Sequence, residues 1–453
     1  MGRAVILSIP FHGHVNPTLA VVQELVARGE EVIYYSSEIF KERLEQVGAH
    51  FRQYDSLFTD EVLQTSANDF AAFLIEEALH VVPQVLEEIR ATQPDYIVYD
   101  TLCLTGRCVA RALDLPAVML FTTHAAGISG RIQKTRKSSA PPVTMAHLPV
   151  AAPQPGEPQQ DVLIVRGNGR SPFPPGFRPA APPQGPGAAP PQGPGVTLAQ
   201  PAAPPAGEDP AKTFNLPLTN PSEVFDYAEP LNIVFVPRAF QVPVKTFDES
   251  YVFVGPSIRA QNAEQPQITR STERPTLYIS LGTVNNEEPE FFKQCLEVFG
   301  NTEWQVVMSI GERLDIAQLG EIPANINVAQ HHPQLAVLPN TDVFITHGGM
   351  NSTLEALSHA IPLVVIAQMP EQTVTAERIA ELGIGIALDK FMLTGEDLRE
   401  AVYRVHNEPS FRQEAAKMQA AIKESGGAKQ AADEILRYTT AGRKAPALDV
   451  AGS

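Results

Sequence analysis

Short apolar runs alternate with amphipathic helical patterns through the first half of the chain. A strand that leads into a helix, repeated several times, is typical of a parallel sheet with helices on both faces. The apolar runs predict strands at 4–10, 31–37, 95–100, 117–121 and 231–237, and the helical patterns predict helices at 19–29 and 105–113.

The second half repeats this scheme. Its patterns predict strands at 276–282, 305–310, 326–330, 342–348, 362–367 and 384–389, and helices at 288–300, 350–360, 371–383, 394–407 and 410–438. The predicted fold class is therefore α/β, with two Rossmann-like, doubly wound domains that face each other across a cleft. Open parallel sheets bind ligands beyond the carboxyl ends of their strands, so we expect the ligand in that cleft.

The middle of the chain has a different composition. Residues 141–210 hold 20 of the 41 prolines, and the sequence PPQGPG occurs there twice. Such a stretch buries too little apolar surface to offset the entropy of ordering it, so we expect disorder. The resulting division is an N-terminal domain at 1–139, a Pro/Gly-rich insertion at 140–212, the end of the N-terminal domain and a linker at 213–260, a C-terminal domain at 261–440 whose last helix returns to the N-terminal domain, and a flexible tail at 441–453.

Composition narrows the class of protein. The chain of 453 residues is 43% hydrophobic and 19% charged, which suits a soluble globular protein. Its formal charge of −17 repels phosphate backbones and argues against nucleic-acid binding. Three cysteines without metal-ligand spacing fit a reducing cytosol, and no apolar run has the length of a membrane span or the form of a signal peptide. We therefore expect a cytoplasmic protein with no membrane span and no metal site.

Two polar residues mark the expected ligand-binding edge of the first sheet. His14 follows the first predicted strand in the segment PFHGHVNP, and Asp100 closes the third. Transfer of a group to an alcohol needs a base, for which histidine is suited, and a carboxylate can orient the imidazole ring. The alternatives are a histidine that caps the first helix and an aspartate that caps the helix beginning near Thr105. His12, earlier in the same turn, has a weaker claim to be the base.

A glycine-containing turn lies in the most distinctive segment, residues 331–372. There the strand sequence DVFIT leads into HGG and the start of a helix. Glycines let the backbone approach a ligand, and the unpaired amides of a helix N-terminus favour a diphosphate. His347, Asn351 and Ser352 add side-chain donors, and Glu355 follows one helical turn later.

This segment resembles the nucleotide-sugar signature of the family 1 glycosyltransferases, which have the GT-B fold. The sequences HGHVNP, LNIVFVPRAFQ, YVFVGPS and YISLGT resemble the same family, and the bacterial macrolide and flavonoid glycosyltransferases are the nearest group. The resemblance covers 1–130 and 218–440. It implies inverting, metal-independent transfer of a hexose, glucose in the first instance, from a UDP-sugar co-substrate to a hydroxyl of a small hydrophobic acceptor such as a macrolide or flavonoid. The resemblance also implies a role in antibiotic resistance.

The resemblance also implies roles for individual residues. His14 would be the general base and Asp100 its partner, and protein donors in place of a metal would stabilise the leaving diphosphate. For the nucleotide sugar, Thr283, His347, Gly348, Gly349, Asn351 and Ser352 would hold the diphosphate, Glu355 the ribose hydroxyls, Glu371 and Gln372 the sugar hydroxyls, and His331, His332 and Gln334 the nucleotide.

Some positions depart from the family pattern. His331 stands where plant members have a tryptophan that stacks on the base, Glu371 replaces an aspartate, and Ala360 replaces a glycine. The family's acceptor-pocket helices also fall where this chain is rich in proline. Because of these departures, the resemblance does not determine the nucleotide preference or the identity of the acceptor.

The sequence leaves two other functions open. A nucleotide-sugar epimerase, or a transferase that builds cell-wall precursors, shares the fold, but an epimerase needs further acid–base carboxylates for which we find no clear motif. A binding protein with a donor site and an impaired acceptor site is the second alternative. The proline-rich middle favours it, whereas the pairing of His14 with Asp100 does not.

Overall fold

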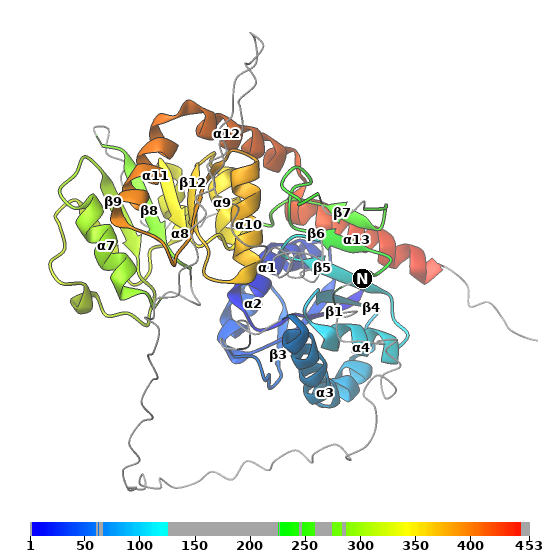
Figure 1. Cartoon of the computed structure of the whole chain (residues 1–453). Coiled ribbons are helices and arrows are strands. Elements are labelled where there is room, and N and C mark those ends of the chain that lie inside the picture. The colour runs from blue at the N-terminus through cyan, green and yellow to red at the C-terminus, as the bar shows by residue number, and fades with distance from the viewer. Residues whose placement is uncertain are drawn as a thin grey trace, which may run out of the picture.

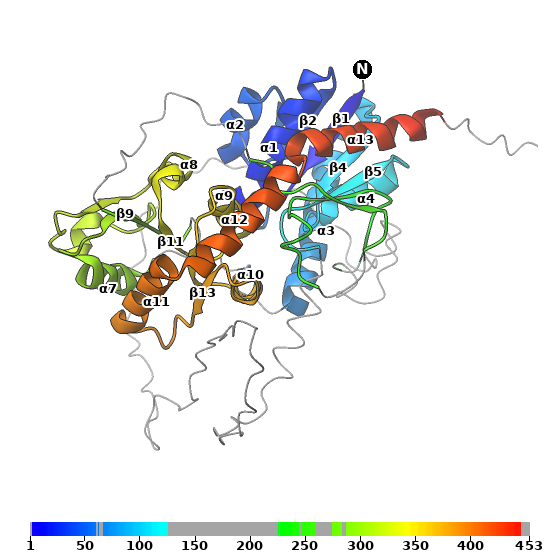
Figure 2. The same ribbon diagram turned by 90° about the horizontal axis from the view of Figure 1, so that it is seen from above.

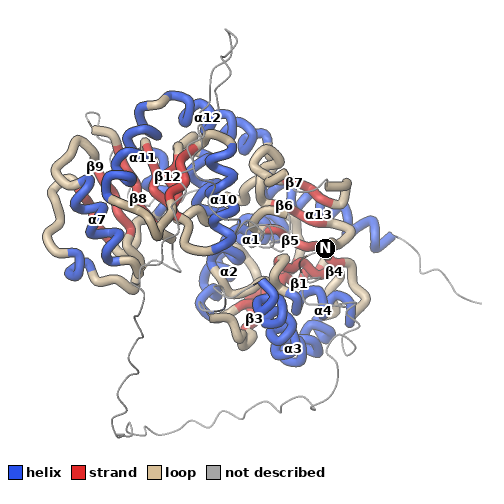
Figure 3. Tube along the Cα trace, in the orientation of Figure 1, coloured by secondary structure: helices blue, strands red, loops and turns tan. Residues whose placement is uncertain are grey.

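The computed structural model describes residues 2–59, 62, 67–125, 225, 227–243, 247–258, 274–282 and 287–444. Within these residues two domains each contain one parallel sheet covered by helices (Figures 1 and 3). The insertion expected at 140–212 and residues 445–453 of the expected tail lie outside the described residues.

The N-terminal domain is built on a seven-stranded parallel sheet with the order β3-β2-β1-β4-β5-β6-β7. Its central strands are buried on both faces, which is why they are continuous apolar runs in the sequence. The elements are β1 (Arg3–Leu7), α1 (His12–Ala27), β2 (Glu31–Ser36), η1 (Glu38–Phe40), α2 (Lys41–Gln46), β3 (His50–Gln53), α3 (Ala67–Thr92), β4 (Tyr96–Asp100), α4 (Leu104–Ala112), β5 (Ala117–Phe121), β6 (Asn232–Val234) and β7 (Tyr251–Phe253).

The C-terminal domain has a six-stranded parallel sheet with the order β10-β9-β8-β11-β12-β13. All six strands lie where the apolar runs predicted them. The elements are β8 (Thr276–Ser280), α7 (Pro289–Phe299), β9 (Gln305–Ser309), η4 (Ile316–Leu319), β10 (Ile326–Ala329), α8 (Gln334–Val337), η5 (Leu338–Asn340), β11 (Val343–Thr346), α9 (Met350–Ser358), β12 (Leu363–Ile366), α10 (Pro370–Glu381), β13 (Gly385–Leu388), α11 (Gly395–Asn407), α12 (Pro409–Glu424) and α13 (Gly427–Lys444).

The last two helices connect the domains. The sequence predicted one helix at 410–438, but Ser425 and Gly426 separate α12 from α13, and Gly427 at the start of α13 has a φ of +54°, which a glycine adopts without strain. From this break α13 crosses back to the N-terminal domain and packs against α1 (Figure 2). Ile435 is fully buried in the N-terminal core, and Arg28, the C-cap of α1, pairs with Asp433 at 2.6 Å. Because α13 reaches Lys444, it extends past the point where the tail was expected to begin.

Other elements differ from the expectation in physically understandable ways. The first helix begins at His12, seven residues before the predicted start, because Gly13 and Pro17 interrupt the apolar pattern without preventing the first turns from forming. Strand β3 buries only one of its four residues, so it carries no apolar run. No helix within the described ranges has the length and apolar character needed to cross a membrane.

Candidate active site

The parallel pairing of β1 with β4 brings His14 and Asp100 to the same edge of the N-terminal sheet. Leu7 is opposite Tyr99 in the register, so the chain leaves both strands side by side. His14 lies in the first turn of α1, not in a turn before it, and its Nδ1 is 2.8 Å from Oδ2 of Asp100. The Asp100 side chain is fully buried, whereas that of His14 remains 14% exposed.

Asp100 is held in place by its own backbone neighbours. The amide of Leu102 donates to Oδ1 at 2.9 Å, which leaves Oδ2 for the histidine. The alternative role of Asp100 as a helix cap does not apply, because α4 begins after Cys103 and has no side-chain cap. Thr122, at the end of β5, also places its hydroxyl 3.2 Å from Nδ1 of His14.

This environment determines the charge behaviour of His14. Burial by itself lowers the pKa of the imidazole, but the charge of Asp100 and its hydrogen bond outweigh burial and raise the pKa above its usual value. An ionised carboxylate accepts hydrogen bonds only, so the hydrogen of the neutral ring sits on Nδ1. Nε2 therefore carries the lone pair that can remove a proton.

Among the described residues, His12 has no hydrogen bond to a carboxylate. Its Nδ1 lies 3.2 Å from a guanidinium nitrogen of Arg43, and its ring meets Phe40 edge-on with centroids 4.9 Å apart. Burial and the Arg43 charge lower the pKa of His12. Of the two histidines in HGHVNP, the structure pairs only His14 with a carboxylate.

The HGG turn of the C-terminal domain is packed tightly around His347. A Cβ atom at Gly282 or Gly349 would lie 2.6 or 2.4 Å from the His347 ring, and Gly348 has a φ of +83°. Space therefore favours glycine at Gly282 and Gly349, and the left-handed backbone favours it at Gly348 and also at Gly282, where φ is +84°. Burial lowers the pKa of His347 to about 4, so its ring is neutral, and among the described residues its buried Nδ1 has no hydrogen-bond partner.

Helix α9 begins directly after this turn. Gly349 is its N-cap and provides no side-chain cap, so the first amides of α9 are available to an anion. Asn351 and Ser352 lie in the first turn, and the side-chain amide of Asn351 donates to the backbone carbonyl of Gly13 at 3.1 Å. Thr283, the remaining expected diphosphate ligand, lies outside the described residues.

Glu355 is one turn further along α9. Nε2 of Gln334 donates to its carboxylate at 2.5 Å, and burial raises the pKa of Glu355 to about 7 in spite of that bond. Two of the expected nucleotide ligands thus lie together. His331 is exposed, and the backbone amide of His332 donates to the Ser309 hydroxyl at 3.1 Å.

Glu371 and Gln372 lie in the first turn of α10. Gln372 caps its own helix, because its Oε1 accepts hydrogen bonds from the amides of Gln368 at 2.8 Å and Met369 at 3.1 Å. Its Nε2 donor is consequently the group left for a ligand. Burial raises the pKa of Glu371, and the charge of His14 across the cleft partly opposes this rise.

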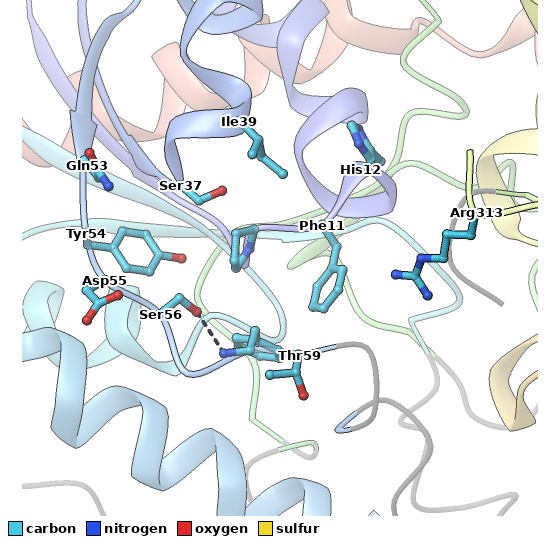
Figure 4. Close-up of a pocket in the computed structure, with 12 residues that line it drawn as sticks. Phe11, His12, Ser37, Ile39, Gln53, Tyr54, Asp55, Ser56, Thr59 and Arg313 are labelled. Carbon is cyan, nitrogen blue, oxygen red and sulfur yellow. Dashed lines mark hydrogen bonds between the residues drawn. The ribbon is translucent and has the colours of Figure 1, made fainter. Parts of the chain in front are cut away.

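A cavity of about 450 Å³ opens beside the turn that precedes His14 (Figure 4). It lies at the carboxyl ends of β1, β2 and β3, and Phe11 and Phe58 form part of its wall with ring centroids 5.5 Å apart. Tyr54 and Ser56 add polar groups, and Arg313 reaches it from the C-terminal domain. A cavity of this size suits a small organic molecule.

Sequence reasoning missed Thr122 and the cavity residues other than His12. Phe11 directly precedes HGH and Thr122 directly follows the strand at 117–121, so their positions beside strand ends were a usable signal. Arg313 offered none, because its approach depends on how the two domains meet. Within the described ranges no group of three or more His, Cys, Asp or Glu side chains is arranged to hold a metal ion.

The sequence is similar to those of known glycosyltransferases. Residues 293–435 match the family model described as erythromycin biosynthesis protein CIII-like, C-terminal domain. The chain is 34% identical over 442 residues to the NDP-glycosyltransferase YjiC of Bacillus subtilis (strain 168), covering 95% of this chain and 96% of that protein. It is 27% identical over 437 residues to the oleandomycin glycosyltransferase of Streptomyces antibioticus, covering 94% and 89% of the two chains.

The fold is similar to solved structures as well. The crystal structure of CalG4, the calicheamicin glycosyltransferase, superimposes with a TM-score of 0.72 at 28% identity, covering 98% of this chain and 100% of the other. The predicted GT-B arrangement of two parallel sheets is thereby confirmed. The chain belongs to the family 1 nucleotide-diphosphate-sugar glycosyltransferases, related to YjiC and to the macrolide glycosyltransferases.

Proposed function

We propose that the protein transfers a hexose, with glucose as the first choice, from a UDP-sugar to a hydroxyl of a small hydrophobic acceptor, with inversion at the anomeric carbon and without a metal. The single observation that carries the proposal is the pairing of His14 with the buried Asp100, which leaves Nε2 of His14 as a base. A protein that only binds nucleotide sugars has no use for this pair.

The proposed reaction is one displacement. Nε2 of His14 takes the proton of the acceptor hydroxyl while that oxygen bonds to the anomeric carbon. The bond from the anomeric carbon to the diphosphate oxygen breaks on the opposite side, and the nucleoside diphosphate leaves with the electron pair. Asp100 stabilises the imidazolium that results.

The leaving diphosphate would be stabilised by the neutral ring of His347 and by the N-terminus of α9. Glu355 and Gln334 would bind the ribose. Glu371 would accept hydrogen bonds from sugar hydroxyls, and Nε2 of Gln372 would donate one.

The cavity beside Phe11 supports a small, partly aromatic or otherwise apolar acceptor, since its wall combines aromatic rings with hydroxyl groups. The relatives named for oleandomycin and calicheamicin support a complex natural product as the acceptor class. Macrolides and flavonoids are therefore the acceptors to test first.

The test is to incubate the full chain with UDP-glucose or TDP-glucose and a panel of macrolides and flavonoids, and to follow the acceptors by mass spectrometry. The proposal expects at least one acceptor to gain one hexose, with the β-configured product formed from an α-configured donor. Donor binding with slow hydrolysis and no transfer to any acceptor would favour the binding protein. Conversion of the donor into a different sugar nucleotide would favour the epimerase.

A further inference from the structure

The backbone carbonyl of Gly13 lacks its regular helical partner. In α1 that carbonyl would accept a hydrogen bond from the amide four residues later, but residue 17 is a proline and has no amide hydrogen. The side-chain amide of Asn351, from the other domain, donates to this carbonyl at 3.1 Å. Pro17 thus makes a first-turn carbonyl available to a donor outside the helix.

This hydrogen bond joins the two halves of the proposed active site. Gly13 directly precedes His14, and Asn351 is the second residue of α9, whose N-terminus lies at the HGG turn. Helices α1 and α9 are in contact, and Figure 2 shows them side by side. The bond therefore links the turn that carries the base to the turn expected to receive the diphosphate.

We propose that Asn351 is a positioning residue that holds the His14 turn in register with the bound donor. Its amide nitrogen has two hydrogens, so one can be donated to Gly13 while the other is donated to a phosphate oxygen. Binding of the donor would then fix Asn351 and, through Gly13, the distance between Nε2 of His14 and the anomeric carbon. This inference rests on the proposed role of His14 as the base.

The contact is suited to alignment and contributes little to stability. Gly13 is exposed, so water replaces Asn351 at the carbonyl whenever the bond is broken. A Cβ atom at Gly13 would meet nothing within 4 Å, so no packing interaction fixes this residue from outside its own helix. Proper alignment of reacting groups has large effects on rate even where the net free energy of a contact is small.

Pro17→Ala tests the proposal without altering any group expected to touch the donor. Alanine supplies an amide hydrogen to the Gly13 carbonyl within α1, and this second donor draws the carbonyl toward the helix axis and weakens its hydrogen bond from Asn351. We expect single-turnover transfer at saturating UDP-glucose to fall by ~3–10-fold, the factor that one neutral hydrogen bond is worth. Donor affinity measured by calorimetry should stay unchanged.

Pro83→Ala is the control for the loss of a proline within a helix, because Pro83 lies inside α3 of the same domain and is exposed. It should leave the transfer rate unchanged. Asn351→Ala should lower both donor affinity and saturated rate. Adding Pro17→Ala to it should cause no further loss of rate, since both changes act on the same bond. Melting temperatures show that the variants compared are folded.

Two results would overturn the inference: a folded Pro17→Ala protein with the wild-type saturated rate, or a double variant in which the two rate losses multiply. If Pro17→Ala does not fold, Asn351→Asp takes its place, because a carboxylate cannot donate a hydrogen bond to the Gly13 carbonyl. A wild-type saturated rate in Asn351→Asp would equally reject the proposed role of the Asn351–Gly13 bond. If His14→Ala loses transfer while either of these results is obtained, the assignment of His14 as the base stands and only the proposed role of Asn351 is rejected.

Discussion

Replacing Asp100 with asparagine changes one atom next to the proposed base. The amide of Leu102 donates to Oδ1, so the new side chain keeps its carbonyl oxygen there and turns its NH₂ group toward His14. A donor then faces Nδ1, and the imidazole hydrogen moves to Nε2. The atom that should remove the acceptor proton becomes protonated.

The size of the effect follows from the same contacts. The variant loses a charge-assisted hydrogen bond worth ~1.5–3 kcal/mol, and restoring the working tautomer leaves a buried donor unpaired at a further ~1–3 kcal/mol. These terms together correspond to a rate loss of roughly 10²–10⁴. The pH dependence should change too, because without the Asp100 charge only the smaller effect of the Glu371 charge opposes burial, and the pKa of His14 falls from above to below the ordinary value of 6.5.

Single-turnover transfer, measured from acidic to alkaline pH on wild type and Asp100→Asn, tests this reasoning. The wild-type rate should decline as the pH falls through the raised pKa of His14, since the protonated ring cannot act as a base. The residual activity of the variant should decline only at lower pH. Asp95→Asn, at the opposite end of β4, is the control, because Asp95 accepts a hydrogen bond from the Arg3 amide far from the cleft. A folded Asp100→Asn protein with the wild-type rate and pH profile would refute the account.

Three further outcomes are expected. UDP-glucose should bind more tightly as the pH rises through about 7, because burial raises the pKa of Glu355 to about 7 and its ionised carboxylate is the stronger acceptor for the ribose hydroxyls. In calorimetry, Glu355→Gln should weaken binding and flatten this pH dependence. A pH dependence that survives the change would be evidence against the ribose contact. Ala360, which follows α9, has a φ of +56°, a backbone conformation that is strained for alanine but not for glycine. Ala360→Gly should therefore stabilise the protein by about 0.5–1 kcal/mol and raise its melting temperature. A lower melting temperature would contradict this argument. Transfer should persist after exhaustive chelation, because the proposed diphosphate contacts are protein donors; activity that disappears and returns with magnesium or manganese would contradict the metal-independent mechanism.

The sequence predicted the central strands of both sheets because those strands are buried on both faces and therefore apolar throughout. It did not predict β3, whose single buried residue is Phe51, or β7, which has three partly buried residues. The long helix α3 has an apolar face but was not recognised. The break between α12 and α13 was missed because glycines also occur within helices, and only the packing of α13 on α1 requires a change of direction there.

The candidate site, like the fold, could be predicted from the sequence only in part. Strand order alone places His14 near Asp100, because β1 and β4 are neighbours in a parallel sheet. The sequence could not show that Leu102 and Thr122 complete the surroundings of this pair, since those contacts depend on side-chain geometry. The bond between Asn351 and Gly13 depends on the relative position of the two domains, which no local pattern encodes.

The central claim is that His14 is the base of a glycosyl transfer. The most direct measurement combines calorimetry with UDP-glucose and single-turnover transfer on one preparation of His14→Ala, with thermal melting as the check of folding. Donor affinity should be nearly unchanged, because the expected diphosphate contacts belong to the other domain, while the transfer rate should fall by ~10²–10⁴. A folded His14→Ala protein that transfers sugar at the wild-type rate would contradict the claim.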